Sequence, residues 1–325
     1  MLVNRPDPTA EAQAIRPRSG WGAPIALALL TIAFSVAGQA GLLLFVPLAL
    51  LLLAIPPRRP GLIGLGAILL LVAYLGRAPG DPLWWFSRGW ALMLGAWFVV
   101  LTTLRPSAKF LDRGLGAVFG TAASAALMFV VTRSGWETLD TTVSARLHDS
   151  ASAAAAQFGP SLAARDWGAE AVQAMTRAAD LQAVIFPALL ALASLTALGV
   201  AWWLWRRLTV REPQPLAALR EFRFRDELVW LAVIAVVLIV LPLGQEPTRA
   251  GTNLATFMGA LYALRGLAVA LAMFGPPGPF GVLLGVFAGV VLFPFVVATT
   301  VMLGLTDTWL DLRSRIRPAV PPTGS

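Results

Sequence analysis

Nine apolar runs, separated by short polar connectors, constrain this chain more than any other feature of its sequence. A helix needs about 20 apolar residues to cross the hydrocarbon core of a bilayer, within a range of about 17–25. In lipid, a helix satisfies the polar groups of its own backbone. We therefore predict an all-α, polytopic transmembrane helical bundle of about nine spans, within a range of eight to ten. The predicted spans lie near residues 23–38, 41–56, 61–77, 83–104, 111–132, 182–205, 228–244, 252–274 and 278–305.

The composition agrees with lipid as the solvent for most of the side chains. Of the 325 residues, 58% are hydrophobic and 13% are charged. Soluble domains average about 45–50% apolar and about 25% charged residues. An excess of this size does not fit inside one globular core, because the surface of a soluble protein must still meet water.

The rarest residue types exclude several kinds of chemistry. The chain has no cysteine, so it cannot form disulfides, thiolate nucleophiles or cysteine-ligated metal sites. Its one histidine, His148, lies in a polar, alanine-rich stretch and is expected to be solvated. Lys109 is the only lysine, and no phosphate-binding Gly-x-x-x-x-Gly-Lys loop is present. We expect no metal, no cofactor and no enzymatic activity.

The basic residues predict an orientation in the membrane. A net charge of +8 could indicate nucleic-acid binding, but the arginines lie in connectors between apolar runs, as the positive-inside bias requires. We therefore expect no nucleic-acid partner, and a multi-pass protein of the bacterial inner membrane with a cytoplasmic N-terminus. The basic connectors follow spans two, four and six, and they carry Arg58, Arg59, Arg105, Lys109, Arg113, Arg206, Arg207, Arg211, Arg220, Arg223 and Arg225.

The spacing of the runs divides the chain into five parts. The connector before span six is expected to form two amphipathic helices, near 138–157 and 161–180, on the outer surface. It acts either as a lid or as a structural cap. Pro294 could break the last span and return the tail to the cytoplasm. The five parts are a cytoplasmic tail (1–22), a first membrane block of five spans (23–132), the extracytoplasmic connector (133–181), a second block of four spans (182–305) and an interfacial tail (306–325).

Ridges of small residues at four-residue spacing predict close helix packing. Such ridges let helix backbones approach one another in lipid. They pack within the bundle or, alternatively, dock other membrane protein subunits. The residues are Gly281, Gly285 and Gly289 in the last span, Gly116 and Gly120 in the fifth, and Ala33 and Ala37 in the first.

Arg265 is the strongest candidate for a functional side chain. It lies inside a predicted span, where a charge costs about 2.5–3.5 kcal/mol on insertion scales, so it should face the protein interior. On one reading it binds a small anionic solute, with Tyr262 and Asn253 as further substrate-binding residues. On the other it forms a structural ion pair with Asp307 or Asp311, near Arg313.

Four stretches resemble the YybS-like family of bacterial polytopic membrane proteins, a domain of unknown function. They are Phe45-Val46-Pro47 through Arg58-Arg59-Pro60-Gly61, the basic connector before span seven, Asn253 with Leu261-Tyr262 and Gly266-Leu267-Ala268-Val269, and Leu303-Gly304-Leu305-Thr306-Asp307 followed by Asp311 and Arg313. The resemblance covers roughly residues 23–315. It implies a distant similarity to the substrate-binding subunits of energy-coupling-factor transporters, in which small residues of the first helix, here Ala33 and Ala37, dock on a partner.

Two functions follow from these observations. The first is a transport-related membrane subunit that binds a small solute within the helical bundle. The alternative is a structural or assembly protein that binds other membrane proteins. Besides the lipid bilayer, the expected partners are therefore a solute of unknown identity or other membrane protein subunits.

Overall fold

The computed structural model describes residues 22–35, 40–75, 81–132, 135–163, 168–210, 221–275 and 278–313. These residues form helices and connectors, with no strand among them. The helices are α2 (Gly22–Phe34), α3 (Ala40–Ala54), α4 (Pro60–Leu75), α5 (Pro82–Leu104), α6 (Phe110–Thr132), α7 (Trp136–Ala163), α8 (Gly168–Thr209), the short 3₁₀ helix η3 (Asp226–Leu228), α9 (Val229–Val240), α10 (Gln245–Phe274), α11 (Pro279–Val291) and α12 (Phe293–Leu310).

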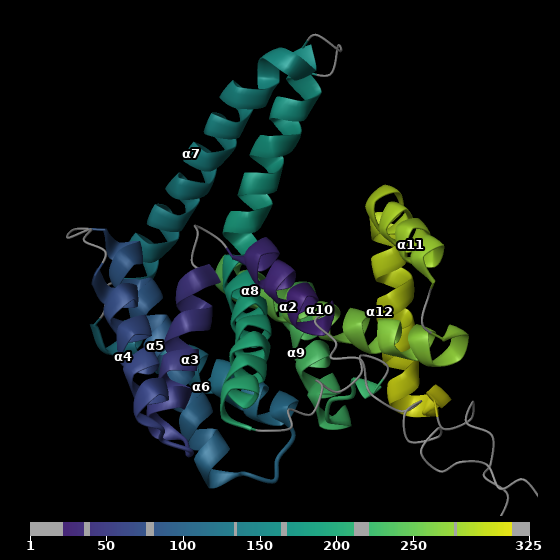
Figure 1. The fold of residues 1–325 in the computed structure, drawn as a ribbon. Coiled ribbons are helices and arrows are strands. Elements are labelled where there is room, and N and C mark those ends of the chain that lie inside the picture. The colour runs from purple at the N-terminus through teal and green to yellow at the C-terminus, as the bar shows by residue number, and fades with distance from the viewer. Residues whose placement is uncertain are drawn as a thin grey trace, which may run out of the picture.

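Helix α8 organises the fold. Its 42 residues extend over about 63 Å, roughly twice the thickness of a hydrocarbon core. It packs against α2, α3, α6, α7 and α10. Its C-terminal half lies within the bundle, while its N-terminal half pairs with α7 in a hairpin that projects from the bundle (Figure 1).

The projecting hairpin differs from the expected outer connector in two ways. We predicted two helices lying on the surface and a boundary between connector and span at 181–182. The structure instead has one uninterrupted helix across that boundary. Helix α7 likewise continues through 159–160, where Gly-Pro was expected to separate two helices.

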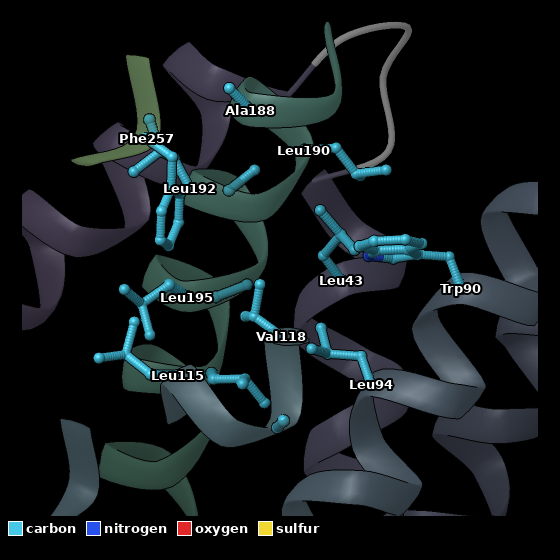
Figure 2. Close-up of a cluster of buried hydrophobic side chains, with 14 of the residues drawn as sticks. Leu43, Trp90, Leu94, Leu115, Val118, Ala188, Leu190, Leu192, Leu195 and Phe257 are labelled. Carbon is cyan, nitrogen blue, oxygen red and sulfur yellow. The ribbon is translucent and has the colours of Figure 1, made fainter. Parts of the chain in front are cut away.

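The main core lies around the C-terminal half of α8. Leu43 of α3, Trp90 and Leu94 of α5 and Val118 of α6 converge there (Figure 2). Two pairs of polar groups join helices across this core. Trp90 Nε1 donates to Ser194 Oγ over 2.9 Å, and Thr31 of α2 is hydrogen-bonded to Thr196 over 3.0 Å. Paired polar groups avoid the desolvation cost of an unsatisfied donor.

Five of the described helices are long and apolar enough to cross a membrane, namely α5, α6, α8, α10 and α12. The predicted count of nine spans is therefore not confirmed. Helices α2, α3, α4 and α9 have 12–16 residues and extend over about 18–24 Å, less than the roughly 30 Å hydrocarbon core. Proline follows α3 at Pro56 and α9 at Pro242, so these two helices end although an apolar residue follows each of them.

The predicted last span is two helices. The chain turns at Leu292, so that α11 and α12 form a helical hairpin (Figure 1), and Pro294 lies in the first turn of α12. Proline suits this position because the first turn of a helix has no use for its missing N–H. Helix α12 packs closely on α10.

Glycine permits the close approach of α10 and α12. A Cβ atom at Gly266 would lie 1.7 Å from the carbonyl oxygen of Thr300, and one at Gly304 would lie 2.1 Å from that of Tyr262. Neither position could therefore hold a larger residue without separating the helices. The two backbones thus meet at a pair of reciprocal glycines that the sequence analysis did not single out.

Candidate functional site

Arg265 lies at the centre of a charge cluster where α10 meets α12. Its side chain is 0% exposed. The cluster contains three cations and three acids, so its formal charges balance. Its members come from α10, α12 and the connector between α8 and α9, and they are Arg265, Asp307, Arg313, Asp226, Arg223 and Asp311.

The protein itself occupies the guanidinium of Arg265. Nε donates to Asp307 Oδ2 over 3.0 Å, Nη1 donates to Asp226 Oδ1 over 2.8 Å, and Nη2 donates to the carbonyl of Asp307 over 3.2 Å. Phe224 covers one face, with its ring centre 5.3 Å from the guanidinium carbon. All three nitrogens are used internally, which leaves little capacity to bind an anionic solute.

Asp307 has a second cationic partner. Arg313 Nη2 donates to Asp307 Oδ2 over 2.7 Å, and Arg313 Nη1 donates to the carbonyl of Phe222 over 3.0 Å. Asp307 is also 0% exposed. These contacts hold the end of α12 against the connector that follows α8.

The other predicted acid takes a different place. Asp311 does not contact Arg265 but pairs with Arg223 over 3.3 Å. Asp226, which was not predicted from the sequence, is the second carboxylate that accepts a hydrogen bond from Arg265. Its position directly before an apolar helix, inside an arginine-rich connector, was the available indication that this acid serves an internal partner.

The predicted binding residues Tyr262 and Asn253 contact different parts of the bundle. Tyr262, 2% exposed, packs edge-on against Phe224 with ring centres 5.1 Å apart, and so lines the Arg265 cluster. Asn253 lies on α10 more than two turns before Tyr262 and makes its contacts with α8. The three predicted residues therefore do not form one pocket.

Asn253 hydrogen-bonds to the backbone of α8 at the turn that contains Pro187. Proline lacks an N–H and its ring displaces the preceding turn, so nearby groups lose their usual partners. Asn253 Oδ1 accepts from the Ala188 N–H over 3.0 Å, and Asn253 Nδ2 donates to the carbonyl of Val184 over 2.8 Å. One amide side chain thus supplies both an acceptor and a donor to the interrupted helix.

Arg249 extends this repair toward the hairpin. Its Nη2 donates to the carbonyl of Ala183 over 3.0 Å, and its two Nη atoms hold the carboxylate of Asp140 on α7. Arg249 also lines an open depression of about 650 Å³ with residues of the α9–α10 turn. The lining residues are Val184, Pro242, Gly244, Gln245, Glu246, Thr248, Arg249 and Thr252.

The ridges of small residues have different surroundings. Gly116 and Gly120 on α6 pack against α5, where a Cβ at Gly120 would lie 2.7 Å from the indole of Trp97. At Gly285 and Gly289 on α11, such a Cβ has no atom of the described residues within 4 Å. Gly281 is half-buried and Ala33 is exposed, while Ala37 lies outside the described residues. Within the described part of the chain, no group of three His, Cys, Asp or Glu residues could hold a metal ion.

Comparison with known families accounts for nearly the whole bundle. Residues 23–308 match the family described as "Predicted membrane protein (DUF2232)". The chain belongs to this family. The match begins in α2 and ends just after Asp307, so the DUF2232 region contains Arg265 and Asp307 and excludes Asp311 and Arg313. No curated protein and no solved structure matches this DUF2232 chain.

Family membership and the apolar helices together establish the broad class of this DUF2232 protein. It is a membrane protein with several apolar helices, five of which are long enough to span a bilayer. The family description names no activity, ligand or partner. A more specific function must be argued from the geometry described above.

Proposed function

We propose that this protein is a non-catalytic assembly protein of the bacterial inner membrane, which binds another membrane protein through α11. The observation that carries the proposal is the glycine face of α11, where no described atom lies within 4 Å of a Cβ built at Gly285 or Gly289. Helix interfaces in lipid are enriched in such small residues, because they let a second backbone approach closely. The same helix exposes Phe280 and Phe287, which could flank a docked helix.

The Arg265 cluster also favours assembly over solute binding. A binding site needs polar groups that remain available to a ligand. Arg265 is instead buried, and its guanidinium donates hydrogen bonds to Asp307 and Asp226. The buried charge therefore supports a structural role, in which it fastens the α11–α12 hairpin to α10 and holds α11 in place.

The test replaces one glycine of the α11 glycine face. Gly285→Leu should leave the fold intact, because a Cβ atom at this position has no described atom within 4 Å. Wild-type protein extracted from native membranes in mild detergent should migrate as a complex larger than its monomer, and Gly285→Leu should migrate as the monomer. The purified variant should keep the wild-type melting temperature.

Two outcomes would count against the proposed assembly role. A wild-type protein that migrates only as a monomer would remove its basis, as would a Gly285→Leu complex of unchanged size. Co-purification of two differently tagged copies would make the partner a second copy of this chain rather than another protein. Gly259→Leu on α10 is a matched control, because a Cβ there also has no described atom within 4 Å. This variant should keep the larger complex.

The open depression beside Arg249 favours a second candidate, a transport-related subunit that binds a small solute. Its volume of about 650 Å³ lies within the usual range of ligand pockets, and Glu246, Arg249 and Thr252 supply charged and polar groups. This candidate agrees with the resemblance to substrate-binding subunits of energy-coupling-factor transporters. It relocates the site from Arg265 to the junction of α8 and α10.

Thermal stability in detergent distinguishes the two candidates. A solute that binds only the folded state raises the melting temperature by mass action. Screening vitamins, carboxylates and phosphates should give no hit for an assembly protein. A hit that Thr252→Leu abolishes, without lowering the melting temperature of the solute-free protein, would favour the solute-binding subunit instead.

A further inference from the structure

A second buried arginine, Arg113, lacks the partners that Arg265 has. It lies in the first turns of α6, and its side chain is 7% exposed. Its Nε is buried with no hydrogen-bond partner, and no acid of the described residues pairs with its guanidinium. The adjacent Asp112 is exposed and forms no ion pair with it in the described part of the chain.

Aromatic side chains rather than acids surround Arg113. Its guanidinium carbon lies 4.6 Å from the centre of the Trp202 ring on α8, and Trp202 stacks on Trp205 with ring centres 4.8 Å apart. The indole N–H of Trp205 is also buried without a partner in the described structure. Arg113 and Trp205 both contact Trp202, and each has a buried N–H donor without an acceptor among the described residues.

The remaining electrostatic influences on Arg113 are unfavourable to a cation. Arg206, one turn after Trp202, is close enough for the two positive charges to repel. The N-terminus of α6 adds the positive end of a helix dipole, which favours anions. The attraction of a cation to an aromatic ring is weaker than the cost of burying an unpaired ion. Among the described residues, Arg113 thus has no negative charge that compensates its own.

We propose that Arg113 and Trp205 form a binding site for a phosphate group, supplied by the headgroup of an anionic phospholipid. The planar guanidinium suits the oxygens of a phosphate, and the indole N–H supplies another donor. Indole rings are enriched at the membrane–water interface, where phospholipid phosphates lie. Arg105 and Lys109 precede α6, so the site lies at a basic end of the bundle that attracts anionic lipids.

The experiment measures the melting temperature of the full-length, delipidated protein in detergent as lipid is added. Phosphatidylglycerol should raise the melting temperature of the wild type by several degrees, and phosphatidylcholine should not. Arg113→Met should abolish the rise. It should also leave the lipid-free melting temperature no lower than that of the wild type, because the substitution removes an unpaired buried charge.

Matched variants exclude a general effect of surface charge. Arg105→Gln removes an exposed cation from the same end of the bundle and should keep the full response to phosphatidylglycerol. Arg113→Lys keeps the charge without the fork and should weaken the response. Native mass spectrometry should find fewer retained phosphatidylglycerol molecules on Arg113→Met than on the wild type.

Several results would overturn this proposal. A response that Arg113→Met retains in full, or no response in the wild type, would remove the site. An equal rise with inorganic phosphate alone would assign the site to a soluble phosphate and exclude the lipid.

Discussion

Two buried guanidinium groups illustrate how differently one residue type can be accommodated in a membrane protein. Arg265 has two carboxylates and a carbonyl within hydrogen-bond distance, and its cluster is formally neutral. Arg113 has an indole face and a neighbouring cation. Since burial of an uncompensated charge is costly, Arg265 should be required for stability, whereas Arg113 should depend on a bound anion.

Asp307→Ala should be the most damaging single change in the Arg265 cluster. It leaves Arg265 and Arg313 without their shared carboxylate, and breaking a buried pair costs about 3–5 kcal/mol. Arg265→Leu should cost less, because Arg313 still neutralises Asp307. Denaturant unfolding in detergent measures both, and Asp311→Ala at the exposed rim should change stability by less than about 1 kcal/mol. Equal losses for Asp307→Ala and Asp311→Ala would contradict a buried, shared carboxylate.

Asn253 and Pro187 should be energetically coupled. Asn253→Ala removes an acceptor from the Ala188 N–H and one of the two side-chain donors from the Val184 carbonyl, which should lower stability by about 1–3 kcal/mol. In a Pro187→Ala background, α8 can form its own backbone hydrogen bonds, so the same substitution should cost much less. A double-mutant cycle in detergent should give a coupling of about 0.5–3 kcal/mol. Strict additivity would show that Asn253 does not serve the proline break.

At the scale of the elements, glycines decide which helices can meet. Gly266 and Gly304 bring the backbones of α10 and α12 together, and Gly120 accommodates Trp97 of α5. Gly285 and Gly289 have the same four-residue spacing as Gly116 and Gly120, yet no described atom lies within 4 Å of a Cβ built at either. Sequence spacing therefore predicts a packing face but not its partner.

Gly266→Ala should separate α10 from α12, because its Cβ would lie 1.7 Å from the Thr300 carbonyl oxygen. We expect a loss of more than about 2 kcal/mol, as for other substitutions that overpack a core. Gly285→Ala is the matched control and should change stability by less than about 0.5 kcal/mol in the purified protein. Equal melting temperatures for the two variants would contradict the close helix crossing.

The α7–α8 hairpin should loosen as the pH rises. The backbone carbonyl of Ser144 and the carboxylate of Asp180 accept from His148 and raise its pKa above the ordinary value of about 6.5. The resulting stabilisation is fully present below the unfolded-state pKa and is lost as the pH rises through the folded-state pKa. Spin labels at Ala155 and Val172 should report broader distance distributions at the higher pH. His148→Gln should remove this pH dependence, and a dependence that persists would exclude His148 as its origin.

How far the sequence predicts these elements depends on the origin of each signal. The length of the apolar runs predicts the existence of α5, α6 and α10. It also predicts the helical class of the fold, because a spanning segment in lipid must satisfy its own backbone hydrogen bonds. It cannot predict that α8 continues through Pro187, since the groups that repair the break, Asn253 and Arg249, lie over 60 residues away. The pairing of Arg265 with Asp307 was one of two open readings, and Asp226 was missed because a connector carries no periodicity.

For the whole molecule, the charge cluster suggests where the C-terminus lies. Arg313 and Asp311 contact Phe222 and Arg223 in the connector after α8, which is one of the basic connectors. Because α11 and α12 form a hairpin, the chain can return to the side of the membrane on which α10 ends. Nine crossings would place the C-terminal Arg313, Arg315 and Arg317 outside, against the positive-inside bias, whereas the hairpin return would place them on the side of the basic connectors.

Single cysteines should reveal this topology, and the cysteine-free chain suits the method. A membrane-impermeant thiol reagent applied to intact cells should label a cysteine at Ala155, near the hairpin tip. It should not label cysteines at Ser107 or Leu312, which should react only after the membrane is opened. Labelling of Leu312→Cys in intact cells would place the end of α12 outside and contradict the hairpin return.

The position of the Arg265 partners along the chain has a consequence for biosynthesis. Ribosomes add residues from the N-terminus, so Asp226 is made 39 residues before Arg265, whereas Asp307 follows 42 residues later. While α10 is being inserted, its arginine therefore has only one of its two carboxylates. The segment becomes neutral and enclosed only when α12 folds back beside it, so a nascent chain arrested before residue 307 would hold α10 less firmly than the finished protein.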